Sequence, residues 1–86
     1  MNRTPVTPEE AATAILRIYK AYDQHAAGSV LDERVFSANL LKVMSADEGN
    51  AGIAHGASAG WWSTDGQGSY SLTQAGANEI LKDKTI

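Results

Sequence analysis

Two glycine-containing pairs in the last third of the chain indicate a tight turn. Asp65-Gly66 and Gln67-Gly68 separate segment 61–64 (WWST) from segment 69–72 (SYSL). Glycine and aspartate tolerate the positive φ angles that a short hairpin turn requires, so this pattern predicts a β-hairpin over residues 61–72. Because helical patterns lie on both sides of the hairpin, we expect an α+β fold.

The register of this hairpin decides which tryptophan faces the core. If the loop has an even number of residues, Trp61 lies opposite Tyr70 or Leu72 and shares their face, whereas Trp62 points the other way. We therefore expect Trp61 to anchor the hairpin to the core and Trp62 to lie on the outer face. A loop with an odd number of residues would exchange the two tryptophans.

Residues that cap helices occur at several places in the chain. Thr7–Glu10 contains a cap, a proline in the first turn and the glutamate of a capping box. Asp32 is a cap for a second helix, and Ser45 with Glu48 forms another capping box for a third. Thr73 is a cap for a last helix after the hairpin.

Apolar residues at three- and four-residue spacing indicate how far each helix extends. The first pattern continues to Ala26, just before Gly28, which is a natural stop. The second pattern runs through DERVFSANLLKVM. The core-facing residues expected in the second and last helices are Phe36, Leu40, Val43, Met44, Ala77, Ile80 and Leu81.

The third helix is rich in glycine, and each glycine costs a helix about 0.5–1 kcal/mol relative to alanine, so it needs tertiary support. Gly52, Gly56 and Gly60 recur every fourth residue and form a stripe without side chains if the segment is helical. Three interpretations remain open. The stripe is a surface on which the backbone of a partner packs, it is space for a bulky residue of the same domain, such as a tryptophan, or the segment is partly a loop.

Length and composition suit a small folded protein. The chain has 86 residues, of which 43% are hydrophobic and 20% charged, and its formal net charge is −3. We predict a single domain over residues 1–86, with an N-terminal arm (1–7), a helical part (8–60), the hairpin (61–72) and a C-terminal helix (73–84). The chain lacks an apolar run of bilayer length and a secretory leader pattern, so we expect a cytoplasmic protein that does not enter membranes.

The passage from the hairpin into the last helix resembles a known family. Residues 70–76 (YSLTQAG) are similar to the Y-x-L-T-x-x-G passage that leaves the wing in many bacterial winged-helix regulators of the PadR and MarR type. The resemblance implies a winged-helix fold in which the hairpin is the wing and Gly28–Leu31 is a short first strand. In that family the second and third helices form a helix-turn-helix, the third helix enters the major groove of DNA, and the wing touches the DNA backbone.

The distribution of charge departs from that DNA-binding pattern. Between Lys42 and Lys82 there is no lysine or arginine, whereas Asp47, Glu48, Asp65 and Glu79 lie in this interval. DNA affinity comes largely from neutralising phosphates, so nucleic acid is a disfavoured partner. The residues available to a DNA-binding protein are Asn50, His55, Ser58, Thr64, Gln67, Arg17 and Lys20.

No pattern predicts a catalytic or cofactor site. Gly56–Gly60 reads G-x-S-x-G beside His55, but a nucleophile elbow needs a preceding buried strand and a larger sheet than this chain can supply. His25 and His55 are isolated and the chain has no cysteine, so neither a metal site nor a disulfide is predicted. We expect no enzyme activity, no cofactor and no small-molecule ligand.

These observations predict a non-enzymatic interaction module that binds a protein partner, either as a homodimer or as an accessory subunit. The expected partner surface combines the outer tryptophan, the glycine stripe and the tyrosines of the first helix, which are Trp62, Gly52, Gly56, Tyr19 and Tyr22. The alternative is a DNA-binding transcriptional regulator. That alternative gains support if a dimer brings Arg17 and Lys20 beside the third helix.

Overall fold

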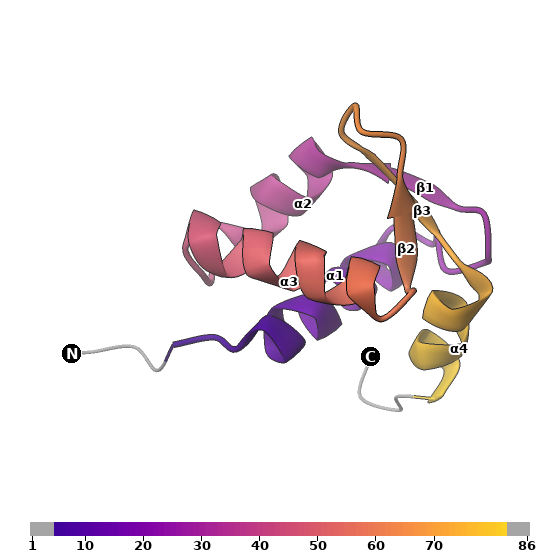
Figure 1. Cartoon of the computed structure of the whole chain (residues 1–86), viewed down its shortest axis with the longest axis horizontal. Helices are drawn as coiled ribbons and strands as arrows, with labels where there is room; N and C mark the ends of the chain where they lie inside the picture. Colours follow the sequence, from indigo (N-terminus) through magenta and orange to yellow (C-terminus); the bar gives the residue numbers. More distant parts are fainter. Residues whose placement is uncertain (1–4, 83–86) are drawn as a thin grey trace.

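In the computed structural model, which describes residues 5–82, four helices pack around a three-stranded antiparallel sheet (Figure 1). The chain therefore has the α+β class that the sequence predicts. The predicted arm and last helix extend in part into residues 1–4 and 83–84, which lie outside the described residues. The elements in chain order are α1 (Pro8–Ala21), β1 (Val30–Asp32), α2 (Glu33–Leu40), α3 (Ala46–Ser58), β2 (Trp62–Thr64), β3 (Ser69–Leu72) and α4 (Gln74–Lys82).

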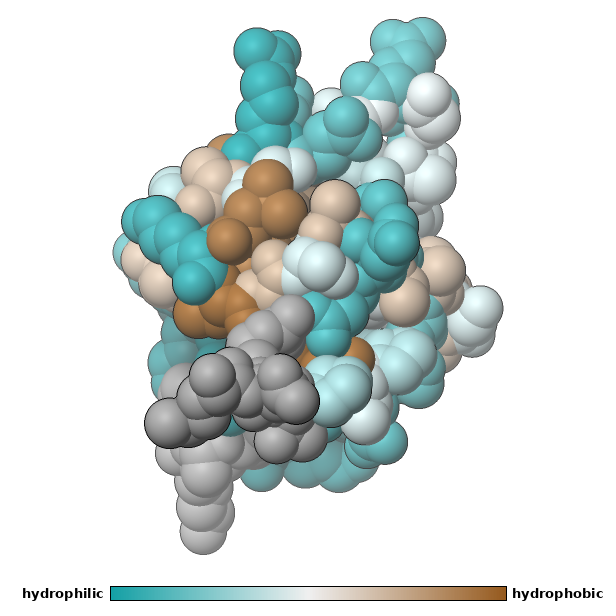
Figure 2. Space-filling view, turned by 90° about the vertical axis from the view of Figure 1, so that its left-hand side faces the viewer, coloured by the Kyte–Doolittle hydropathy of each residue, from teal (hydrophilic) through white to brown (hydrophobic). Residues whose placement is uncertain are grey.

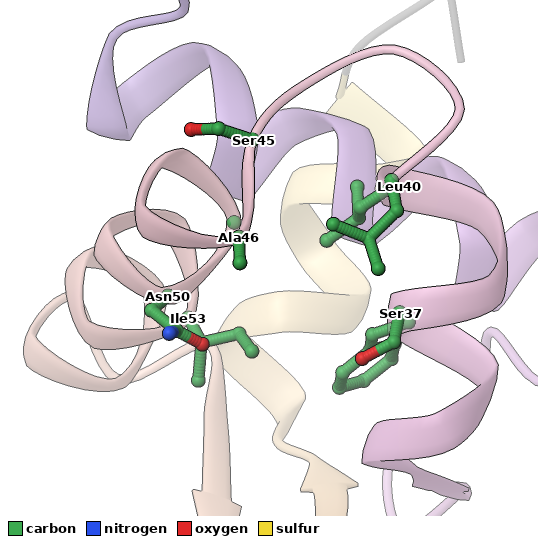
Figure 3. Close-up of a pocket in the computed structure, with 9 residues that line it drawn as sticks. Ser37, Leu40, Ser45, Ala46, Asn50 and Ile53 are labelled. Carbon is green, nitrogen blue, oxygen red and sulfur yellow. The ribbon is translucent and has the colours of Figure 1, made fainter.

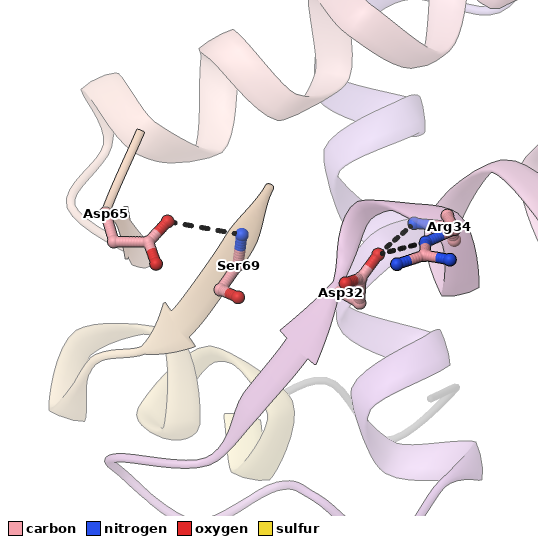
Figure 4. Close-up of polar contacts among 4 residues, drawn as sticks. All are labelled: Asp32, Arg34, Asp65 and Ser69. Carbon is pink, nitrogen blue, oxygen red and sulfur yellow. Dashed lines mark hydrogen bonds and ion pairs between the residues drawn. The ribbon is translucent and has the colours of Figure 1, made fainter. Parts of the chain in front are cut away.

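The predicted hairpin is present, but its predicted register is wrong. The strand order is β1-β3-β2, and Trp62 lies opposite Leu72 in the pair formed by β2 and β3. Gly66 and Gly68 both have positive φ angles, of 80° and 92°. The Asp65 carboxylate accepts hydrogen bonds from the backbone N–H groups of Gln67 and Ser69, at 2.7 and 3.4 Å, the second of which is drawn in Figure 4. This geometry closes a loop of odd length over residues 66–68.

The odd loop exchanges the two tryptophans. Trp62 is only 2% exposed, its ring stacks on Tyr19 with a centroid distance of 6.3 Å, and its indole N–H donates to the Ile53 carbonyl at 3.0 Å. Trp61 is half-buried, and its ring meets His55 edge-on with centroids 5.9 Å apart. The expectation that Trp62 lies on the outer face is therefore wrong.

The capping signals are confirmed. Complete capping boxes begin α1, with Thr7 and Glu10, and α3, with Ser45 and Glu48. The Asp32 carboxylate accepts from the backbone N–H of Arg34 at 2.8 Å and forms an ion pair with its guanidinium, as Figure 4 shows at the start of α2. The Thr73 hydroxyl accepts from the backbone N–H of Gly76 at 3.1 Å at the start of α4.

Two helices end earlier than the apolar spacing predicts. The helix α1 ends at Ala21, because Asp23 has a φ angle of 58°. Gly28 therefore does not end this helix, and its backbone N–H donates to the Leu72 carbonyl at 2.7 Å, just before β1. The helix α2 ends at Leu40, so Val43 is exposed rather than part of an apolar helix face. In α4, Ala77 and Ile80 are buried as predicted, but Leu81 points away from the core and is 76% exposed.

The glycines of α3 serve the chain's own packing. A Cβ atom at Gly52 would lie 2.8 Å from the carbonyl carbon of Ala11, and one at Gly56 would lie 2.6 Å from Cε2 of Trp62. Such distances are shorter than van der Waals contact, so α1 and the Trp62 ring occupy the space that side chains would need. This close packing is the tertiary support that the glycine-rich helix requires.

The buried side chains of α1, β1, α2, β2, β3 and α4 form one core, in which Tyr19 contacts several elements. Its ring lies 5.7 Å from that of Phe36, and its hydroxyl donates to the Tyr70 carbonyl at 2.7 Å. Burial, with an added contribution from Tyr70, raises the pKa of the Tyr19 hydroxyl. The largest fully buried side chains are those of Trp62, Tyr19, Phe36, Ile15, Leu16 and Leu72.

Candidate functional site

The residues predicted to bind a protein partner do not form a surface. Trp62 and Tyr19 are core side chains, and Gly52 and Gly56 are buried beneath α1 and Trp62. These four residues are inaccessible, so their prediction as a partner surface is wrong. Tyr22 alone of this set is exposed, and its hydroxyl accepts a hydrogen bond from the Asn39 side chain at 3.3 Å.

The residues of the DNA-binding alternative are spread over three elements. Asn50 and Ser58 are exposed on α3, and Thr64 and Gln67 are exposed in the hairpin. The half-buried His55 packs against Trp61, near the point where α3 leads into β2. The exposed residues of α3 are Ala46, Asp47, Asn50, Ala54, Ala57 and Ser58, which are small and include no cation.

The two cations of this alternative lie on another part of the molecule. Arg17 and Lys20 are exposed on α1. They lie on the side of that helix opposite Ala11 and Ala12, which pack against Gly52 of α3. Within one copy of the chain, these positive charges therefore do not supplement the exposed face of α3.

The connection between α2 and α3 presents apolar side chains that sequence reasoning missed. Leu41 is 57% exposed and Val43 is 59% exposed, whereas their neighbours Leu40 and Met44 are buried. The alternation arises because the backbone N–H groups of Val43 and Met44 both turn back to the Leu40 carbonyl, each at 2.9 Å. Figure 2 views the side of the molecule on which this connection lies and shows hydrophobic side chains gathered there.

A small groove lies beside these side chains, between α2 and α3. Its volume is about 50 Å³, and the close-up in Figure 3 shows Leu40 and Ser37 of α2 facing Ala46, Asn50 and Ile53 of α3 across it. We call it the α2–α3 groove. It is lined by Phe36, Ser37, Leu40, Leu41, Ser45, Ala46, Gly49, Asn50 and Ile53, none of which is charged.

Both walls of the groove are fixed by named hydrogen bonds. One oxygen of the Glu48 carboxylate accepts from the backbone N–H of Ser45 at 2.9 Å, and the other accepts from the N–H of Val6 at 2.6 Å. The start of α3 is thus held to the chain that precedes α1. On the other wall, the Asn39 amide donates to the Val35 carbonyl within α2 at 2.8 Å.

The charged groups around the groove are few. Lys42 lies between Leu41 and Val43 and has no ion pair within residues 5–82. Asp47 belongs to the first turn of α3, but it lies about 100° around the helix from Ala46, which lines the groove. The connection therefore combines exposed apolar side chains with one positive charge.

The described part of the chain offers neither a group of metal-ligating side chains nor the strand that a serine nucleophile requires directly before it. Among residues 5–82, no group of three or more histidine, cysteine, aspartate and glutamate side chains is placed to hold a metal ion. Ser58, from the G-x-S-x-G pattern, is the last residue of α3 and does not follow a strand.

Comparisons with protein-family models, curated proteins and solved structures gave no match to this chain. Its class is therefore defined by the fold alone, as a small α+β protein with four helices and a three-stranded antiparallel sheet in residues 5–82. None of the helices in that range is long and apolar enough to cross a membrane.

Proposed function

We propose that this protein is a non-enzymatic binding module that holds a protein partner on the α2–α3 groove and the adjoining connection. The observation that carries the proposal is the pair of exposed aliphatic side chains, Leu41 and Val43, beside a groove with an uncharged lining. Single exposed apolar residues are ordinary, but two of them next to a hollow provide a small apolar patch that a partner can cover. Full burial of such a side chain stabilises a complex by about 1.5–3 kcal/mol. Because each of these two side chains is about half exposed, its burial by a partner contributes about half of that free energy.

We further propose that the chain has a winged-helix arrangement. Two features support it, namely the order of its elements and the position of β3 between β1 and β2. In this arrangement α2 and α3 are the helix-turn-helix and the β2–β3 hairpin is the wing. The groove then lies between the two helices of the helix-turn-helix. Fold alone does not fix function, so the proposed partner rests on the surface chemistry.

DNA binding is the second candidate, and the same arrangement of helices and hairpin favours it. Against it stands the charge of the relevant elements. The helix α3 has Asp47 and Glu48 in its first turn and carries no lysine or arginine, and Asp65 lies at the start of the hairpin loop. Because phosphate neutralisation supplies most of the affinity of such proteins for DNA, a protein partner agrees better with this surface.

The proposal is tested by capture of partners with matched variants. The full chain is immobilised and exposed to an extract of the cells that produce it, in three forms: wild type, Leu41→Ser/Val43→Ser, and Leu81→Ser. Leu81 is also an exposed aliphatic residue, but it lies on α4. We expect a protein that the wild type and Leu81→Ser retain equally and the double variant loses. Equal retention by all three forms would exclude this surface.

A separate titration tests the second candidate. Amide NMR spectra are recorded as mixed-sequence duplex DNA is added at low salt and again at higher salt. Shifts in residues 46–70 that disappear with salt would establish DNA binding through α3 and the hairpin. We expect no such shifts.

A further inference from the structure

The dimensions of the α2–α3 groove indicate what part of a partner enters it. A water molecule needs about 10–15 Å³ of such space, so a volume of about 50 Å³ admits roughly four atoms of that size. This space suits the tip of one aliphatic side chain rather than a larger group. Leu41 and Ile53 supply the accessible apolar surface. The polar lining residues Ser37, Ser45 and Asn50 are uncharged, so the group that fits is a single aliphatic side chain.

Gly49 keeps this space open without being required by the fold. A Cβ atom at this position would meet Leu40 Cδ1 at 3.5 Å, an ordinary contact, whereas the same atom at Gly52 or Gly56 would overlap a neighbour. The residue is helical and has no positive φ angle. Alanine at position 49 is therefore compatible with the fold, although its methyl group would take space from the groove.

Lys42 is the cation of the connection that adjoins the groove. It lies on the connection between the two exposed aliphatic residues, and it lacks an ion pair within the described residues. The other cations near α2 and α4 have partners, since Arg34 pairs with Asp32 and Lys82 with Glu79. A carboxylate on the partner would therefore find Lys42 available.

We infer that the partner presents an acidic amphipathic peptide segment, which inserts one aliphatic side chain into the α2–α3 groove and places a carboxylate against Lys42. This inference rests on the proposed function and adds the chemistry of the partner. Apolar contact supplies the affinity, and the ion pair selects acidic segments over basic ones.

The test selects ligands from a library of random twelve-residue peptides displayed on phage, with the full chain as the target. We expect the selected peptides to share a leucine, isoleucine or methionine with an aspartate or glutamate within one helical turn. One such peptide is then synthesised, and its affinity is measured for the wild type and for variants. Selection of peptides without acidic residues, or of none, would overturn the inference.

Three variants separate the parts of the inference. Lys42→Glu is expected to lower the affinity for the acidic peptide about fivefold and to raise the affinity for a version of the peptide that has lysine in place of the acidic residue. Gly49→Ala is expected to weaken binding about tenfold while the melting temperature stays the same or rises. Leu81→Ser, on another face, is the control and is expected to bind as the wild type does.

The outcomes distinguish this inference from the proposed function. If Leu41→Ser/Val43→Ser abolishes binding but Lys42→Glu does not affect it, the surface is correct and the acidic partner is wrong. If none of the groove variants affects binding, both are wrong. Analytical ultracentrifugation of the wild type and of Gly49→Ala tests whether a second copy of the chain occupies the groove. If the wild type self-associates and the alanine variant does so more weakly, the occupant is the chain itself and not a peptide of another protein.

Discussion

The indole N–H of Trp62 donates a hydrogen bond to the carbonyl of Ile53 at 3.0 Å and thereby joins the first residue of β2 to the middle of α3. The ring reaches this carbonyl because Gly56, one turn further along α3, has no side chain in its path. The hairpin and the third helix thus form one packed unit, and this contact depends on the register of the hairpin.

The two adjacent tryptophans are expected to differ in their contribution to stability. Trp62→Ala should lower the free energy of unfolding by about 3–5 kcal/mol, because it removes a fully buried ring and leaves a cavity. Trp61→Ala should cost clearly less, since that ring is only half-buried. Urea denaturation of both variants measures the difference. A larger loss at Trp61 would contradict the register described here.

Three glycines of the same helix are expected to respond differently to alanine. Gly56→Ala should destabilise the protein by about 1–3 kcal/mol, because the new methyl group overlaps Trp62. Gly52→Ala should act in the same direction against Ala11. Gly49→Ala should instead stabilise it by about 0.5–1 kcal/mol, because only the helix propensity changes. Thermal unfolding of the three variants distinguishes packing from propensity, and equal effects would argue against the close contacts.

Adjacent leucines at the end of α2 provide a matched pair. Leu40 is buried and Leu41 is exposed. Leu40→Ala should lower the free energy of unfolding by about 2–5 kcal/mol, whereas Leu41→Ala should change it by less than about 0.5 kcal/mol. Chemical denaturation of both variants is the measurement. If both substitutions are costly, the helix continues past Leu40 and the exposed connection does not exist.

Tyr19 is expected to make stability fall at alkaline pH. Burial raises the pKa of its hydroxyl, so the unfolded chain loses this proton near the ordinary tyrosine value of 10.0 while the folded chain keeps it. The stabilisation is therefore complete below that pH and decreases as the pH rises above it.

Tyr19→Phe isolates this effect. At neutral pH the variant should lose about 0.5–1.5 kcal/mol with the hydrogen bond to the Tyr70 carbonyl. Above pH 10 its stability should depend less on pH than that of the wild type. Unfolding curves recorded between neutral and alkaline pH compare the two, and parallel profiles would mean that Tyr19 does not titrate as a buried group.

Local signals were sufficient to predict where helices begin. The capping boxes at Thr7 and Ser45 involve residues three positions apart, so they can be read directly from the chain. The ends of the helices were harder to predict. Apolar spacing continues through Val43 and Leu81, but neither residue is buried, because burial depends on which other elements cover each face.

The candidate site was missed because the register and the end of α2 were both misjudged. The Trp62 ring packs on Gly56, so the interpretation of the glycine stripe as space for a tryptophan of the same domain is correct there, whereas the placement of Trp62 on the outer face is wrong. The exposed connection did have a signal. Ser45 must cap α3, so α2 cannot continue through that position, and the residues just before the cap are left in a turn.

The odd-numbered loop at residues 66–68 limits how the length of this hairpin can change during evolution. Side chains along a strand alternate between two faces, so a one-residue insertion or deletion that keeps a three-residue loop shifts β2 against β3 by one position and places Trp61, rather than Trp62, on the face of Leu72. Adding or removing two residues preserves the alternation and leaves Trp62 above Gly56. Where the three-residue loop is kept, viable insertions and deletions at this tip are therefore expected to occur in pairs of residues.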